Sequence, residues 1–144
     1  MPSHLAVFRA LPSYSILPMQ FVTFDGVAGD FLIRPATAAT DIPVGVSQVG
    51  YDVPPNLIQA LSSNTATYTP VAAQPGEELA CYTIGDIAPV VLGAAVTAGS
   101  MITFNSSGLA VMAVPGAGSW FGGIAVQAGS TGGVIDIFVA LGKS

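Results

Sequence analysis

The sequence predicts an all-β protein, and three observations support this fold class. Glycine and proline together make up 28 of the 144 residues, well above their usual share of about 12%, so any helix would be interrupted every few residues. Several short stretches alternate apolar and polar residues with the period of two that strands have. Glycine-bearing turn signals, such as Asp25-Gly26 and Gly85-Asp86, separate these stretches. The length favours one domain.

Residues 1–20 are apolar and aromatic, without the clean period of a strand or a helix. A free solvated tail would be polar, so we expect an extended N-terminal arm that docks on something, followed by a single β domain over residues 21–144. The alternative is that this segment forms the first edge strand of the same core. If it is an arm, its deletion leaves the fold intact and weakens assembly. The large side chains through which it would bind are Phe8, Leu11, Tyr14, Ile16 and Leu17.

From Phe21 onward the pattern is strand, turn, strand. The first strands are expected at 21–24, 31–33 and 44–46, with a Thr/Ala linker at 36–40. Pro35 should end the second of them, because proline cannot donate to a ladder. A single helical turn, capped by Asn56, is expected at 56–61.

The second half of the chain carries clearer strand patterns. Residues 78–84 alternate, with Ala80, Tyr82 and Ile84 on one face, and end at the Gly85-Asp86 turn. Strands at 101–104 and 109–114 flank a hairpin turn at 105–108, in which Gly108 supplies positive φ. In the last strand, 134–141, one face carries Ile135, Ile137, Val139 and Leu141, and Asp136 points the other way.

A faint internal echo links two segments of the chain. Residues 44–50 (VGVSQVG) resemble residues 122–129 (GGIAVQAG), and both follow a proline-bearing linker and precede a turn. Two related half-barrels would explain the echo. The limited amino-acid alphabet of this chain would explain it as well.

Charged residues are scarce: only 11 of the 144 residues carry a formal charge, three basic and eight acidic. A folded monomer of this mass exposes roughly 6,900 Å², which leaves one charge per about 600 Å². That area equals the largest apolar patch on a typical monomer. We therefore expect the outside of the chain to be buried against copies of itself, a larger assembly or a lipid phase.

Charge and hydropathy also narrow the class of partner. The net charge of −5 disfavours nucleic acid, which requires a basic face. Pro89, Gly93 and Gly99 interrupt the apolar windows that a spanning helix would need, so no membrane partner is expected. The first residues lack the basic start of a secretory signal. The single Cys81 is interpreted as a buried small hydrophobe.

Catalytic constellations are almost absent from the sequence. The only histidine, His4, lies in the expected arm, so a nucleophile on the body has no plausible base. The acidic pairs, Asp25 with Asp30 and Glu77 with Glu78, are interpreted as structural. We expect no enzyme activity, no cofactor and no metal.

The aromatic pair Trp120-Phe121 follows a glycine-rich stretch. If exposed, it could stack on a sugar ring or anchor an interface. Burial of one or both rings in the core is the alternative. The pair joins the five arm residues as a candidate interface.

A further pattern runs from about Asp30 to the end of the chain. Its segments are Arg34–Asp41, Gly45–Ser47, Pro75–Glu78, Gly85–Val90, Ala95–Ser100, Asn105–Val111 and Gly123–Ala125. They are mostly turn glycines and valines. In these segments the chain resembles the small capsid decoration, or cement, proteins of tailed bacteriophages.

The resemblance implies a compact β-barrel-like or β-tulip domain on the outer surface of the virion capsid, made in the host cytoplasm. Such a protein binds the major capsid protein, assembles as a homo-dimer or homo-trimer, and stabilises the head. The alternative is a carbohydrate-binding or adhesion β-module of a virion, at the base of a head fibre or associated with the tail. In both cases the role is structural.

Overall fold

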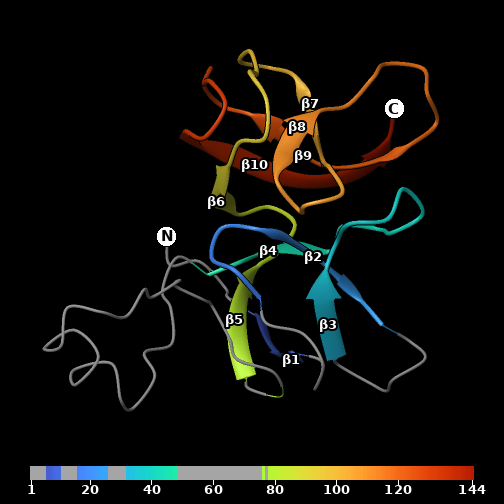
Figure 1. The fold of residues 1–144 in the computed structure, drawn as a ribbon, viewed down its shortest axis with the longest axis vertical. Coiled ribbons are helices and arrows are strands. Elements are labelled where there is room, and N and C mark those ends of the chain that lie inside the picture. Colours follow the sequence, from blue (N-terminus) through green and yellow to red (C-terminus); the bar gives the residue numbers. More distant parts are fainter. Residues whose placement is uncertain (1–5, 11–15, 26–31, 49–75, 77) are drawn as a thin grey trace, which may run out of the picture.

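The computed structural model describes residues 6–10, 16–25, 32–48, 76 and 78–144, and every regular element in these ranges is a strand. The predicted all-β class is confirmed. The strands are β1 (Ala6–Ala10), β2 (Phe21–Phe24), β3 (Leu32–Pro35), β4 (Gly45–Ser47), β5 (Glu78–Tyr82), β6 (Ile87–Val91), β7 (Met101–Phe104), β8 (Ala110–Met112), β9 (Trp120–Ala125) and β10 (Val134–Lys143). They form two halves that stack along the long axis of the molecule (Figure 1).

The first half is a closed barrel with strand order β1-β3-β2-β4-β5. β1 closes it, because it pairs antiparallel with β5 and parallel with β3. β1 is therefore paired along both of its edges, through residues 6–9 with β5 and through residues 9 and 10 with β3. Ile16 is fully buried in the barrel core. In the described part of residues 1–20, the chain forms an integral strand of the barrel, neither an edge strand nor a detached arm.

The second half is a five-stranded sheet with order β6-β10-β9-β7-β8. A parallel bridge from Leu92, just after β6, to Ala110 of β8 links its two outer strands. The predicted hairpin is present between β7 and β8: Gly108 has φ of 79°. The Asn105 side-chain oxygen accepts hydrogen bonds from the backbone N–H groups of Ser107 and Leu109.

Several boundaries differ from the sequence-based expectation. β3 continues to Pro35, whose position opposite Val22 needs no N–H from the proline. β5 ends at Tyr82, and its buried face is that of Leu79 and Cys81. The predicted helical turn at 56–61 lies outside the described residues.

The two halves share one topology. In the first half, the antiparallel pairs are β1–β5, β2–β3, β2–β4 and β4–β5. The corresponding pairs in the second half are β6–β10, β7–β8, β7–β9 and β9–β10, in the same order along the chain. In each half, the first strand also meets the third in parallel, through a ladder in the barrel and through the Leu92–Ala110 bridge in the sheet. Five pairings of the same sense in the same order are the sign of a repeated unit.

The registers agree residue by residue as well. Phe21 pairs with Val46 and Val46 with Tyr82, just as Met101 pairs with Ile124 and Ile124 with Phe138. Hydrogen bonds outside the ladders repeat too. The N–H of Ala36 donates to the Phe21 carbonyl at 3.0 Å, and its equivalent in the second half is the bond from Ala113 to Met101 at 2.8 Å. Likewise, the N–H of Ser47 donates to the Gln20 carbonyl at 2.9 Å, and its equivalent is the bond from Ala125 to Ser100, also at 2.9 Å.

This register explains the echo seen in the sequence. It superimposes Gly45-Val46-Ser47 of β4 on Gly123-Ile124-Ala125 of β9, the alignment that the echo contains. It also superimposes β2, with sequence FVTF, on β7, with sequence MITF. The chain is therefore a tandem repeat of one five-stranded unit. The structure therefore supports the first explanation of the sequence echo, which is that the chain contains two related half-barrels.

Each half encloses its own apolar cluster, and the two clusters differ in one respect. The barrel cluster contains only first-half residues, including Ile16, Val22 and Cys81. The second cluster contains the interior of β6–β10 and also Phe21, Ala36 and Val46 from the first half. The outer side of the barrel thus packs onto the second half and completes its core.

Candidate assembly surfaces

The structure places the predicted arm residues in different environments. Phe8 is half-buried in β1, with its ring edge-on to Phe24 at a centroid distance of 5.2 Å. Ile16 is fully buried, so its side chain packs inside the protein. Leu17 is 39% exposed. Leu11 and Tyr14 lie outside the described residues.

Trp120 and Phe121 begin β9, and both are half-buried. The Lys143 ammonium lies over the indole ring of Trp120, 5.0 Å from its centroid, which is the geometry of a cation–π contact. A Cβ on Gly142 would lie 2.7 Å from the Phe121 ring, so that glycine makes room for the ring. Both aromatic side chains thus have intrachain partners.

A group of exposed apolar residues follows the outer face of β6, β10 and β9. Ile87 is 59% exposed and lies beside Phe138, which is 45% exposed. Ile124 and Met101 continue this row across the sheet. Val126 and Val134 lie further along the same face and are exposed. The exposed Asp136 lies beside Val126, between Val134 and Phe138, and is the charged residue of this face.

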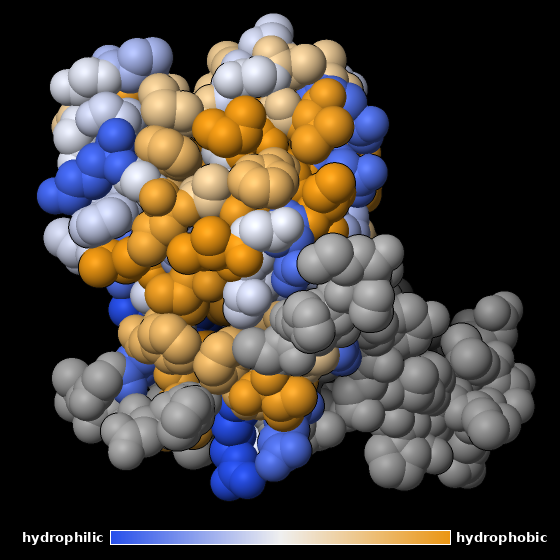
Figure 2. Space-filling view, turned by 180° about the vertical axis from the view of Figure 1, so that it is seen from behind, coloured by the Kyte–Doolittle hydropathy of each residue, from blue (hydrophilic) through white to orange (hydrophobic). Residues whose placement is uncertain are grey.

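One view of the molecule shows how apolar its surface is. Hydrophobic residues run down the middle of the described part, and strongly hydrophilic residues gather mostly at its edges (Figure 2). This agrees with the scarcity of charge in the sequence. Exposed apolar surface on this scale marks an interaction site.

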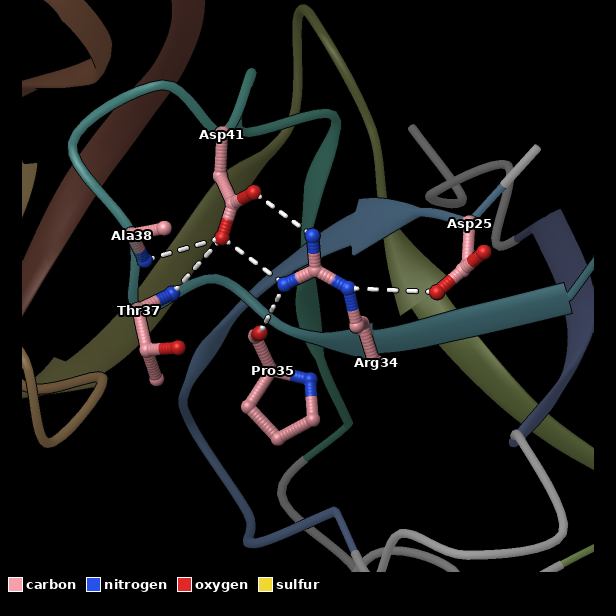
Figure 3. A network of polar contacts seen from close by, with 6 residues as sticks. All are labelled: Asp25, Arg34, Pro35, Thr37, Ala38 and Asp41. Carbon is pink, nitrogen blue, oxygen red and sulfur yellow. Dashed lines mark hydrogen bonds and ion pairs between the residues drawn. The ribbon is translucent and has the colours of Figure 1, made fainter. Parts of the chain in front are cut away.

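Three of the 11 charged residues meet in one network in the first half, between β3 and the loop that leads to β4 (Figure 3). The Arg34 guanidinium donates two hydrogen bonds to Asp41, at 2.8 and 2.6 Å, and lies 3.4 Å from an Asp25 oxygen. The backbone N–H groups of Thr37 and Ala38 also donate to Asp41, at 3.1 and 2.9 Å. These bonds fold the Thr/Ala linker into a fixed loop.

The hydrogen bonds from Arg34 lower the pKa of Asp41 from 3.8 to about 2, against the opposing effect of burial. The carboxylate is therefore charged throughout the physiological range. Because both partners are bound inside the network, they are poorly placed for catalysis. The role of the network is structural.

A shallow pocket of about 290 Å³ opens beside this network. Its lining residues are Thr23, Phe24, Thr40, Asp41, Ile42 and Val44. Phe24 is 46% exposed and Ile42 39% exposed. Phe24 stands at the open end of the barrel, where it contacts Phe8. The pocket therefore combines the apolar side chains of Phe24, Ile42 and Val44 with a polar edge that the Arg34–Asp41 hydrogen bonds hold in place.

Other chemistry finds little support in the residues that the structure describes. Within them, no group of three His, Cys, Asp or Glu side chains is placed to hold a metal ion. Burial raises the pKa of the Cys81 thiol to about 12, so this thiol is inert at neutral pH. The described ranges also hold no helix long and apolar enough to cross a membrane.

Sequence reasoning missed the outer row and the pocket. A signal for Phe138 was present, since the alternation of residues 134–141 places it opposite Ile135, Ile137 and Val139. The pocket had no such signal. It depends on how the loop after β3 returns to Phe24, which the Arg34–Asp41 contact determines.

Fold and surfaces together define an all-β protein of two repeats, with an exposed apolar row on one sheet and a shallow pocket on the barrel. Comparison with protein-family models gave no match, and no curated protein matched. Among solved structures, the chain is similar to the head fibre gp8.5 N base of bacteriophage phi29, with a TM-score of 0.55 and 14% sequence identity over 95% of each chain. At this identity, the likeness establishes a shared fold.

Proposed function

We propose that this chain is a structural protein of a bacteriophage virion, bound to the outer surface of the capsid through the major capsid protein and through other copies of itself. The observation that carries the proposal is the fold shared with a phage head fibre base over 95% of both chains. A match over the full length means that both repeats, and not a single common β unit, are shared.

Two further observations support a role in assembly. With 11 charged residues in 144 and an apolar outer row, the chain has little of the charged surface on which the solubility of a lone domain depends. The segments that resemble phage decoration proteins include Arg34–Asp41, which forms the rigid loop beside the pocket. The proposed partners are proteins, and the proposal assigns no catalysis.

Two forms of this function differ in what the bound chain does. As a decoration protein it clamps neighbouring capsid subunits and stabilises the head. As the base of a head fibre it anchors a projecting part. The structural neighbour favours the second form, because it is itself a head fibre base. The sequence resemblance favours the first.

The test uses the phage particles that contain the chain. Purified protein should co-sediment with capsids from which it has been stripped, and antibodies should label the outside of intact particles. A decoration protein raises the melting temperature of the capsid, whereas a fibre base binds without raising it. Absence from purified particles, together with no co-sedimentation, would contradict both forms.

A further inference from the structure

The tandem repeat leaves one of two equivalent surfaces uncovered. In the first half, the outer row of the barrel consists of Phe21, Val46 and Tyr82. Phe21 is 1% exposed and Val46 is fully buried, because the second half covers them. The equivalent row in the second half is Met101, Ile124 and Phe138, and there Phe138 is 45% exposed beside Ile87 at 59%.

The surface that covers the first row is also known in detail. The Phe21 ring lies against Phe104, with a centroid distance of 6.3 Å. It also lies over Gly122, where a Cβ would come within 2.5 Å of the ring. Phe104 ends β7 and Gly122 lies in β9, so this receiving surface is the open end of the second unit.

The first half has the equivalent surface, and it is partly exposed, with Phe24 46% and Ile42 39% exposed. The register makes Phe24 the equivalent of Phe104 and Val44 the equivalent of Gly122. Both residues line the shallow pocket, and Phe24 is 46% exposed while Phe104 is half-buried. Each unit thus has an outer row and a receiving end. The contact inside the chain uses the row of the first unit and the end of the second.

We propose that a second copy of this chain repeats this contact, with its outer row of Met101, Ile124 and Phe138 seated in the pocket at Phe24, Ile42 and Val44. The contact joins two different surfaces, so it is head-to-tail and produces a ring when the rotation closes. It rests on the self-association in the proposed function and names its surfaces, and it can fail while capsid binding holds, because assembly through these surfaces requires no capsid.

The side chains fit this repetition. Inside the chain, the larger Phe21 lies over Gly122, which has no side chain. Between chains, the register opposes the unbranched and adaptable Met101 to the larger Val44. A large residue thus meets a small one in the first contact, and two medium residues meet in the second.

The exposed apolar side chains beside the row would also contribute to the interface between copies. Ile87, Val126, Val134 and Phe138 are each about half exposed on one face. Together with Met101 and Ile124 of the row, they supply part of the about 800 Å² that each partner buries in a stable complex. A ring gives every copy two such contacts, one through its row and one through its pocket.

The experiment measures molar mass by light scattering on the full chain, without capsids. Wild-type protein should exceed the monomer mass of 14.5 kDa. Phe138→Glu on the row and Ile42→Glu at the pocket should each raise the dissociation constant at least tenfold. The matched control is Val7→Glu, at a residue of β1 that is 61% exposed and belongs to neither the row nor the pocket lining, and it should keep the wild-type mass. Ile87→Glu serves as a second row variant if Phe138→Glu fails to fold.

Mixing distinguishes a head-to-tail contact from a symmetric one. Phe138→Glu retains an intact pocket and Ile42→Glu retains an intact row, so an equimolar mixture should form a one-to-one complex that neither variant forms alone. A monomeric wild type at millimolar concentration overturns the proposal. It is also overturned if Ile42→Glu keeps the wild-type mass, if Val7→Glu dissociates, or if the mixture stays monomeric.

Discussion

The Arg34–Asp41 pair joins two of the 11 charged residues of this chain. Asp41 is 7% exposed and accepts four hydrogen bonds, two from Arg34 and two from backbone N–H groups. Arg34 also contacts Asp25. A side chain with this many partners holds a loop more firmly than apolar packing alone, because each bond has a fixed direction. The network therefore shapes the pocket that we assign to a second copy.

The stability of the protein should depend on pH through Asp41. Its folded-state pKa of about 2 lies below the ordinary 3.8, so the stabilisation is complete above pH 4 and is lost as the pH falls through 2. The loss should reach about 1 kcal/mol at pH 3 and about 2 kcal/mol at pH 2. Denaturant unfolding at a series of pH values measures it.

Asp41→Asn should remove this pH dependence and lower the free energy of unfolding at pH 6 by about 2–3 kcal/mol, because Arg34 loses its main partner. Asp136→Asn, at an exposed carboxylate on β10, is the matched control and should change stability little. If Asp41→Asn retained the wild-type slope between pH 4 and pH 2, another carboxylate would be responsible.

At the level of elements, β1 is essential to the first unit. It supplies both closing ladders of the barrel, one to β5 and one to β3. Ile16 follows it into the core. Without β1 the barrel opens along two edges, and open edges of this kind leave unpaired N–H and C=O groups.

Deletion of residues 1–20 should therefore abolish cooperative unfolding of the first unit, and not merely weaken assembly. Cys81 reports this directly, because it lies opposite Ala6 in β5 and is fully buried in the intact chain. A thiol reagent should label Cys81 quickly in the truncated protein and slowly in the full chain. A truncated protein with slow labelling and a sharp thermal transition would mean that β1 is dispensable.

The elements that could be predicted from sequence are those with local signals. β2, the β7–β8 hairpin and β10 each adjoin a glycine-bearing turn signal, and β10 also alternates; all of them form nearly where expected. β1 has no such signal, because its pairing with β3 and β5 joins residues far apart in the chain. Ile16 was predicted at an interface for the same reason: an apolar side chain without periodicity does not reveal which surface covers it.

The whole molecule is best understood as one unit used twice. The repeat was barely visible in the sequence, since only VGVSQVG and FVTF retain counterparts. The pairing registers preserve the repeat in all five strands of each unit, because backbone hydrogen bonds fix the geometry of a strand pair while its side chains can change. The substitutions between equivalent positions, such as Val44 for Gly122, then adapt each copy of the surface to a different partner.

The contact between the two units should depend on the fit of Phe21 against Gly122. Gly122→Ala places a methyl group within 2.5 Å of the Phe21 ring, and we expect it to destabilise the protein by about 1–3 kcal/mol through overpacking. Phe21→Val removes the ring and should cost about 2–4 kcal/mol through the cavity that it leaves. In the double variant the added methyl group occupies part of that cavity, so its cost should fall at least 1 kcal/mol below the sum of the two single costs. Denaturant unfolding of the four proteins measures this coupling. Strict additivity would show that Phe21 and Gly122 do not pack together, and the equivalence between the contact inside the chain and the contact between chains would lose its basis.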